Sequence, residues 1–197
     1  MIEKLPNKKV KIGKYPIVYP VPIILAGALV NDKPNFETLG DVGIMGIDPA
    51  IVYISSGQSH YTNQGILDHG TYSINFPSSK LLEKTDYCGI VSGRDVDKSK
   101  LFNVFFGELR TAPLIDECPV NLECKVIKEF SIKHRQIFVG EVIQTYINEE
   151  YVMSIEGKHK IADMRKLDPI IYALDNQYYQ IGKSIGIGYR EGRKLKQ

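Results

Sequence analysis

The 197-residue sequence has few cysteines, no uninterrupted apolar run of membrane-spanning length and little net charge. Its cysteines, Cys88, Cys118 and Cys124, form no C-x-x-C pair, so a metal or dithiol motif is not indicated, and buried or half-buried free thiols in a reducing cytosol are expected. The longest apolar stretch, residues 15–30, is broken by prolines and too short to span a bilayer. A formal net charge of +2 does not favour nucleic acid or a membrane surface as a partner.

Several common site motifs are also absent. The chain has no G-x-G-x-x-G, Walker or G-x-S-x-G sequence, which argues against standard dinucleotide and triphosphate loops and against serine hydrolysis. Its N-terminus carries charges but no apolar segment after them, so a signal peptide is not indicated. A soluble cytoplasmic protein is therefore expected, and the length suits one domain with a sizeable core.

The apolar pattern predicts a mainly β chain. Strands are expected at residues 21–30, around Gly43, at 50–56 and at 71–77. Residues 31–35 have the composition of a turn, and residues 35–40, taken alone, predict a turn with an exposed acid at Glu37.

Two longer alternating segments follow. Residues 120–132 and 135–147 predict an antiparallel hairpin that turns at Lys133-His134. The aromatic and glycine-rich residues 168–190 contain short strand signals, and the basic residues 190–196 are expected to be a solvated terminus, with a phosphate-binding arm as the alternative. Strands with a few short helices favour a β-barrel or an α+β fold.

Short helices are expected between the strands. Residues 61–70 predict a helix that Thr62 caps and Gly70 ends. Residues 78–93 predict a second helix that is capped by one of its first two serines and runs into the polar loop, and residues 97–103 predict a further helical turn.

Two polar segments are candidates for an anion site. Residues 85–102, TDYCGIVSGRDVDKSKLF, combine Ser92, Arg94 and Lys98 with glycines that permit close backbone approach. The alternative is a solvated loop whose aspartates pair with its cations, and such exposed pairs contribute little. Residues 52–66 place serines, His60 and Thr62 where a strand enters a helix, which is typical of an anion site but equally of simple helix capping.

Histidines give weaker signals. His134, at the tip of the predicted hairpin, is either a catalytic or ligand-contacting group or a solvated turn residue. The spacing of the histidines and cysteines does not support a zinc site, so no metal is expected.

The order of the segments carries more information than any one of them. Along the chain stand N-x-x-T, P-A-I-V-Y-I-S, S-H-Y-T, Y-S-I-N-F-P-S, D-Y-C-G-I-V-S-G-R-D-V-D-K and F-V-G-E-V. This series, from Pro20 to Val142, resembles the flavin reductase-like family of FMN-binding split barrels and, within it, the flavoredoxin-like branch.

The resemblance implies a fold and an assembly. It implies a mainly β, six-stranded antiparallel split barrel with a few flanking α-helices, and a homodimer with FMN near the subunit interface. We therefore expect a single domain over residues 1–197, with its core at about 15–165 and a C-terminal extension, 166–197, that packs on the barrel or on the dimer partner.

The resemblance also implies redox chemistry and residue roles. NADH or NADPH, or a protein partner, would supply electrons that leave FMN for a second flavin, ferric iron or another acceptor. Asn35 and Thr38 match the motif beside the flavin ring, and Thr38 and His134, near the nicotinamide or substrate side, are the catalytic candidates. Tyr172 or Tyr178 would be an aromatic near the ring. The expected cofactor-binding residues are Asn35, Thr38, Ser55, Ser56, His60, Thr62, Ser92 and Lys98.

Three alternatives remain open at this point. The first is a flavoredoxin-type electron carrier without nicotinamide activity of its own, which needs the same FMN cradle. The second is a small binding or structural dimer that keeps the barrel without the cofactor. The third is an oxygenase component that supplies reduced flavin to a second enzyme.

Overall fold

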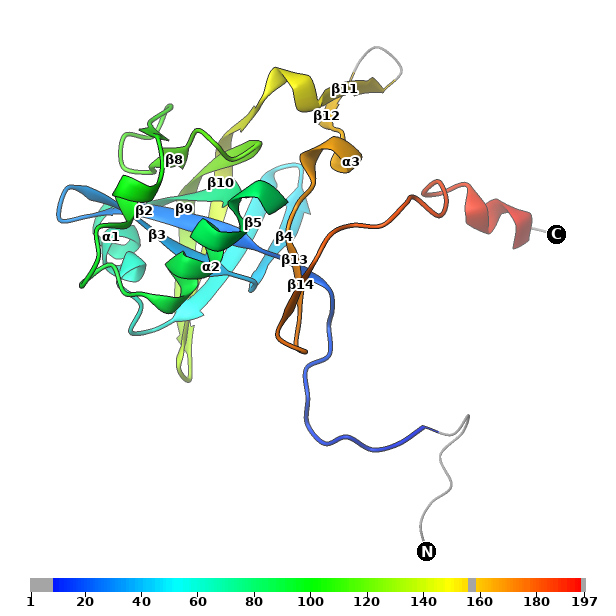
Figure 1. Ribbon diagram of the computed structural model, residues 1–197, viewed down its shortest axis with the longest axis horizontal. Helices are drawn as coiled ribbons and strands as arrows, with labels where there is room; N and C mark the ends of the chain where they lie inside the picture. Colours follow the sequence, from blue (N-terminus) through cyan, green and yellow to red (C-terminus); the bar gives the residue numbers. More distant parts are fainter. Residues whose placement is uncertain (1–8, 156–158, 196–197) are drawn as a thin grey trace, which may run out of the picture.

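The computed structural model describes residues 9–155 and 159–195, and antiparallel β-sheet dominates it (Figure 1). The α-helices are α1 (Thr62–His69), α2 (Leu82–Ile90) and α3 (Met164–Leu167), and short 3₁₀ helices span Ser79–Leu81, Lys98–Leu101, Glu149–Tyr151 and Glu191–Leu195. The strands are β1 (Val21–Pro22), β2 (Ile24–Val30), β3 (Lys33–Leu39), β4 (Val42–Ile47), β5 (Ala50–Gly57), β6 (Thr71–Phe76), β7 (Val104–Phe105), β8 (Leu114–Ile115), β9 (Val120–Ile132), β10 (Arg135–Ile147), β11 (Val152–Ile155), β12 (His159–Ala162), β13 (Ile171–Ala173) and β14 (Gln177–Tyr179).

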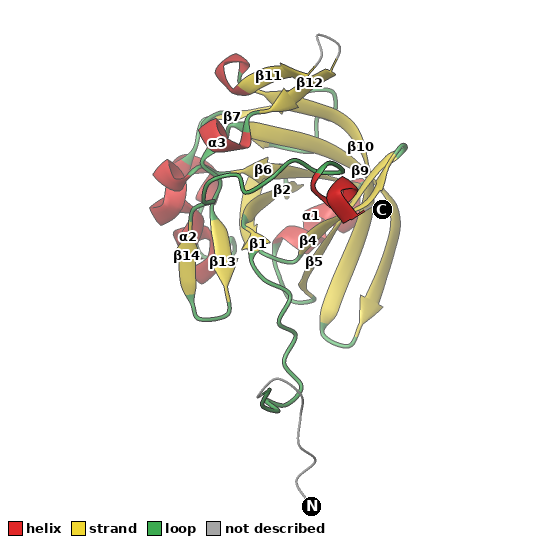
Figure 2. Cartoon of the chain, turned by 90° about the vertical axis from the view of Figure 1, so that its right-hand side faces the viewer, coloured by secondary structure: helices red, strands yellow, loops and turns green. Residues whose placement is uncertain are grey.

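The main sheet has seven strands in the order β3-β2-β6-β9-β10-β5-β4 and curls into a barrel (Figure 2). Its longest pairing is the hairpin of β9 and β10, in which Arg135 pairs with Ile132 and Ile147 with Val120. The predicted hairpin and the mainly β architecture are confirmed. The predicted number of six strands is wrong by one.

The additional strand is β3, in a region that the sequence pattern assigned to turns. Asn31 and Asp32 have φ of 50° and 60° and form a two-residue turn between β2 and β3, so pairing resumes at Lys33. Pro34 is tolerated because β3 is an edge strand, where a missing N–H breaks no ladder. The strand conformation buries Glu37, which is 6% exposed, so the expectation of an exposed acid is wrong.

Two apolar clusters line the two sides of the sheet. Ile24 on β2 packs with Ile54 and Phe138 in one cluster, whereas Leu25, the next residue, packs with Phe36 in the other. Successive strand residues point to opposite faces, and β2 is buried on both. β2 therefore reads as a continuous apolar run because both of its faces lie in the core.

The cysteines belong to these clusters. Cys88 and Cys118 lie in the cluster with Phe36, and Cys124 lies in the other. All three are free and buried, as predicted, and burial raises the pKa of the Cys88 thiol to about 11. They are packing residues, because a buried thiol with a raised pKa is a poor nucleophile.

Helix α1 has the predicted bounds but not the predicted cap. Gly70 ends it with φ of 64°, as expected for a glycine at this position. Thr62 is the first helical residue. The N-cap residue is Tyr61, and its side chain makes no capping hydrogen bond. The Thr62 hydroxyl instead accepts a hydrogen bond from Asn35 Nδ2 at 2.8 Å, so it ties the helix to β3.

The second predicted helix begins with a 3₁₀ turn before α2. The predicted serine cap is wrong here too. Ser78 is the N-cap residue, but its side chain makes no capping hydrogen bond, and the Ser79 hydroxyl donates to Asp168. Helix α2 packs on β3. This contact brings the loop after α2 to the edge of the barrel.

The two ends of the chain lie outside the main sheet. β1, β13 and β14 form a small antiparallel sheet beside α2 (Figure 2). The N-terminal segment and the segment after β14 both lead away from the barrel (Figure 1). Within the described residues, no helix has the length and apolarity needed to cross a bilayer.

Candidate functional site

Two adjoining cavities lie where β3, α1 and α2 meet. One, the apolar cleft, has a volume of about 1090 Å³ and is bordered by aromatic and aliphatic side chains of β1, β5, β10 and the β13–β14 hairpin. The other, the polar cavity, has about 320 Å³ and is bordered by β3, the start of α1 and the loop after α2. Thr38, Gly89 and Ile90 line both, so the two cavities adjoin at these residues.

The polar cavity depends on a close approach of the loop after α2 to β3. A Cβ on Gly93 would lie 2.0 Å from Asn35 Oδ1 and 2.7 Å from the Tyr61 ring. Only glycine permits this approach without displacement. The loop therefore closes one wall of the cavity against Asn35.

The cavity collects cationic and neutral donors. Lys98 is buried, its Nζ donates to the Cys88 carbonyl at 2.7 Å, and burial lowers its pKa. Arg94 lies over the Tyr61 ring at 5.1 Å and donates to the Ser59 carbonyl at 3.1 Å. The N-terminus of α1, with its unpaired N–H groups, borders the same space. This set of donors suits a phosphate.

A buried carboxylate stands among these donors. Glu37 Oε2 lies 2.5 Å from His60 Nδ1 and accepts a hydrogen bond from Ser56 Oγ at 3.2 Å. The hydrogen bond to Glu37 raises the pKa of His60, and burial opposes the shift. Glu37 Oε1 is buried and has no hydrogen-bond partner among the described residues. The polar cavity thus offers one strong acceptor as well as its donors.

Thr38 marks the junction of the two cavities. Its Oγ1 donates to the Thr85 carbonyl on α2, and a Cβ on Gly89 would lie 3.3 Å from the Thr38 Cβ. Strand β3 and helix α2 therefore hold Thr38 firmly between the apolar cleft and the polar cavity.

Tyrosines line the apolar cleft. Both sequence candidates, Tyr172 and Tyr178, border it, with their ring centroids 5.5 Å apart. The Tyr178 hydroxyl donates to Asp86 on α2 at 2.6 Å, and burial, followed by this hydrogen bond, raises its pKa. The cleft therefore offers aromatic side chains against which a planar ligand can pack.

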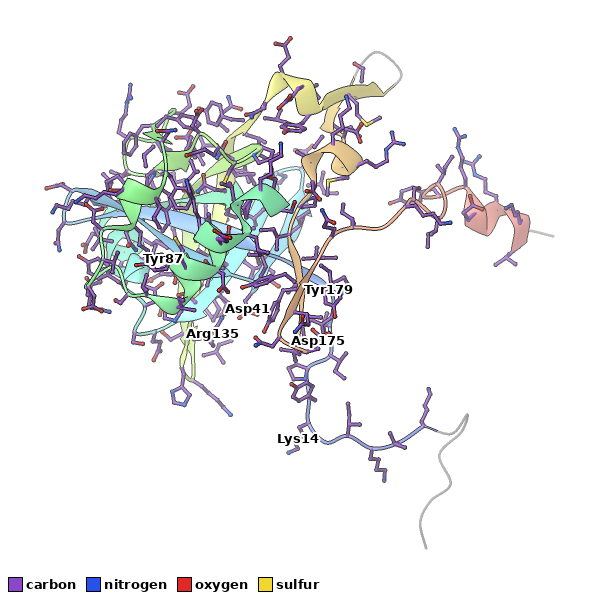
Figure 3. All side chains as sticks on the ribbon, viewed as in Figure 1. Lys14, Asp41, Tyr87, Arg135, Asp175 and Tyr179 are labelled. Atoms are coloured by element: carbon purple, nitrogen blue, oxygen red, sulfur yellow. The ribbon has the colours of Figure 1, made fainter. Side chains whose placement is uncertain are left out.

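Arg135 is the charged residue that sequence reasoning missed in the cleft. Its Nε donates to Ser55 Oγ at 3.1 Å, and its guanidinium pairs with Asp41 (Figure 3). His134, the predicted residue beside it, lies in the hairpin turn and lines neither cavity. Arg135 is the first residue of β10, where pairing with β5 directs it toward the cleft.

The remaining candidates distribute as follows. The structure brings together six of them around the polar cavity: Asn35, Thr38, His60, Thr62, Ser92 and Lys98. Ser55 lines the apolar cleft, and Ser56 lies buried behind Glu37. Glu37 was not among the candidates, and Arg94, which belongs to one of the two candidate anion segments, was not among the expected cofactor-binding residues. A strand assignment for residues 33–39 would have revealed Glu37, since it alternates with Asn35 on the same face.

Comparison with known sequences gives the family. Residues 16–172 match the family described as flavin reductase like domain, and the chain belongs to this family. A protein of Archaeoglobus fulgidus, named as uncharacterized, is 31% identical over 114 residues, which cover 57% of this chain and 64% of that protein.

Comparison with solved structures agrees. Flavoredoxin from Methanosarcina acetivorans is 43% identical, with a TM-score of 0.89 over 95% of this chain and 99% of that one. Flavoredoxin of Desulfovibrio vulgaris (Miyazaki F) is 29% identical, with a TM-score of 0.83 over 93% and 99%. The predicted split barrel and the flavoredoxin-like branch are confirmed.

Proposed function

We propose that this protein is an FMN-binding oxidoreductase that passes electrons through the bound flavin to a second acceptor, with NADH or NADPH as donor. The observation that carries the proposal is that the apolar cleft adjoins the polar cavity, with Thr38, Gly89 and Ile90 lining both. A planar ring system joined to a polar chain and a phosphate needs this succession of surroundings.

The residues present fit FMN. Tyr172 and Tyr178 border a cleft that suits the ring, and Lys98, Arg94 and the start of α1 offer donors to the phosphate. The polar cavity also depends on the close approach of the loop to Asn35 that Gly93 permits. When bound, FMN would supply the hydride and electron transfer. Thr38 would then orient the ring edge, and Arg135 would hold the mouth of the cleft through Ser55 and Asp41.

The first experiment is an absorption spectrum of the purified protein before and after anaerobic addition of NADH or NADPH. We expect flavin absorption that bleaches. Protein that stays colourless after FMN is added would contradict flavin binding and favour a structural dimer that has kept the barrel without its cofactor.

A second candidate function is electron transfer without nicotinamide activity. The likeness to flavoredoxins, at 43% and 29% identity over nearly the whole chain, favours it. Flavin absorption that persists with NADH and NADPH but bleaches with dithionite would support this carrier, which would take electrons from a redox protein. Ferric iron, free flavin and a protein partner are the acceptors to be compared.

Lys98 allows the phosphate site to be tested separately. We expect Lys98→Ala to weaken FMN binding about tenfold or more, because a charge-assisted contact is lost. Riboflavin, which has no phosphate, should bind both proteins alike. The control is Lys100→Ala, whose side chain is 80% exposed. Equal FMN affinity in Lys98→Ala, by fluorescence titration, would remove Lys98 from the site.

We further propose a homodimer in which the chain ends cover a second copy. Ile185 and Tyr189, in the segment after β14, are 97% and 99% exposed, and Ile47 on the edge strand β4 is 87% exposed. Apolar side chains repeated at such exposure mark an interaction surface. Ile185→Asp should lower the molar mass measured by light scattering toward that of a monomer, and Lys183→Asp should not. A monomeric wild-type protein would contradict the proposal.

A further inference from the structure

Glu37 is unusual because it places a carboxylate in a cavity that otherwise suits an anion. It lies on β3 between Asn35 and Thr38 and is 6% exposed. Lys98 and His60 border the same cavity. A phosphate would be repelled by Glu37, so the carboxylate needs a different explanation from the cations around it.

The two oxygens of Glu37 have different surroundings. Oε2 is occupied by His60 Nδ1 at 2.5 Å and by the Ser56 hydroxyl at 3.2 Å. These two partners hold the carboxylate in one orientation. Oε1 is buried and has no partner among the described residues. Buried polar atoms are nearly always hydrogen-bonded in folded proteins, so Oε1 is an acceptor that awaits a donor.

The position of Glu37 indicates the kind of donor. Thr38 lines both cavities, whereas Glu37 lines only the polar one. A ligand whose ring occupies the apolar cleft and whose phosphate lies among Lys98, Arg94 and the start of α1 would pass Glu37 with the chain that joins them. In FMN this chain is the ribityl group, which carries hydroxyl donors.

We propose that Glu37 is a specificity-determining residue whose Oε1 accepts a hydrogen bond from a ribityl hydroxyl. The inference rests on the proposed binding of FMN. His60 is then a positioning residue, because it orients Glu37 through Oε2 and keeps the other oxygen free for the ligand. The site selects flavins that carry a polyol chain over those that have the ring alone.

The test compares three ligands on the full-length protein: FMN, riboflavin, and lumiflavin, which has a methyl group in place of the ribityl chain. Dissociation constants come from quenching of flavin fluorescence. Glu37→Gln should weaken FMN and riboflavin about tenfold or more, because a charge-assisted hydrogen bond is lost. It should change lumiflavin binding by less than about twofold, since lumiflavin has no hydroxyl to offer.

Controls keep the result specific. Glu83→Gln makes the same chemical change at an exposed position of α2 outside both cavities and should leave all three affinities unchanged. Circular dichroism checks that each variant is folded, and Glu37→Asp, which withdraws the carboxylate while keeping its charge, should show the same ligand pattern.

Three results would overturn the inference. Equal weakening of lumiflavin would mean that Glu37 contacts the ring, and unchanged binding of all three by folded Glu37→Gln would mean that it contacts no ligand. In both cases flavin binding itself would stand. Failure of the wild-type protein to bind any of the three would overturn the proposed function together with this inference.

Discussion

Glu37 and Glu123 are both buried, at 6% and 0% exposure, yet their surroundings differ. Glu123 on β9 accepts hydrogen bonds from the Leu109 N–H at Oε1, at 2.8 Å, and from the Glu108 N–H and the Tyr146 hydroxyl at Oε2, both at 2.9 Å. Both oxygens of Glu123 therefore accept hydrogen bonds from groups of the protein itself. Glu37 has two partners on one oxygen and none among the described residues on the other.

The difference separates a structural carboxylate from one that is available to a ligand. Glu123 fastens the loop around Glu108 to the barrel, and both of its oxygens already accept hydrogen bonds from the protein itself. Glu37 gives up part of its hydrogen bonding in the unliganded protein. Burial alone would not have distinguished the two residues, because the decisive feature is whether the chain itself completes the set of partners.

The largest expected effect concerns Glu123. Glu123→Ala should lower the free energy of unfolding by about 2–4 kcal/mol, because it leaves two backbone N–H groups without their acceptor and removes a buried hydrogen-bonded charge. Urea unfolding measures the loss. Glu37→Ala, measured in the same way without flavin, should lower the free energy of unfolding clearly less. An equal loss would show that the two carboxylates stabilise the fold to the same extent.

Two glycines test the same contrast between Glu123 and Glu37, because each packs next to one of the two sites. A Cβ on Gly107 would lie 2.1 Å from the Tyr146 hydroxyl and 2.7 Å from Glu123 Oε2, so Gly107→Ala should destabilise the protein by about 1–3 kcal/mol. A Cβ on Gly57 would lie 2.8 Å from His60 Nε2. The His60 side chain is 47% exposed, so it can shift toward solvent at the loss of its contact with Glu37. Gly57→Ala should therefore cost less stability while weakening FMN binding.

The matched control for both is Gly188→Ala, because a Cβ at Gly188 would have no heavy atom within 4 Å. Thermal unfolding and FMN titration of the three variants give the comparison. Loss of stability in Gly57→Ala as large as that in Gly107→Ala would show that the Glu37 and His60 pair supports the fold as much as Glu123 does.

The smallest expected effect is on pH dependence. The hydrogen bond to Glu37 raises the pKa of His60 in the folded protein, so the stabilisation is complete below the unfolded value of about 6.5 and is lost as pH rises through the folded value. Solvent screens this half-exposed ring, so the effect should stay within about 1 kcal/mol. Urea unfolding of wild type and His60→Gln from acidic to alkaline pH should show their difference shrinking. A constant difference would contradict the ion pair.

Much of the barrel was predictable from local pattern. The β9–β10 hairpin was predicted at its observed bounds, since alternation over thirteen residues on each side of a short turn has no other regular solution. Helix α1 was predicted for a similar reason, with Gly70 in the left-handed conformation at its end. Strand β3 was not, because Asn31, Asp32 and Pro34 are all turn formers, whereas only the first two form the turn and Pro34 lies in an edge strand that tolerates it.

The candidate site was predictable in its members but not in its contacts. The segment order identified Asn35, Thr38, His60 and Lys98 as neighbours of one ligand, and they line one cavity or its junction with the cleft. Arg135 was passed over for His134, because the hairpin pattern alone does not say which residue next to the turn faces the cleft.

The sequence by itself determined the strand periodicity, the family and the residue types of a polar site, because these follow from side-chain spacing and segment order. Only the tertiary structure decided that Thr62 bonds to Asn35 instead of capping its helix, and that Glu37 is buried with one oxygen free. The physical reason is that Asn35, Glu37 and Thr38 lie 19 to 47 positions in the chain from their hydrogen-bond partners. Partners that far apart are brought together by the folding of the barrel, and no local pattern specifies them.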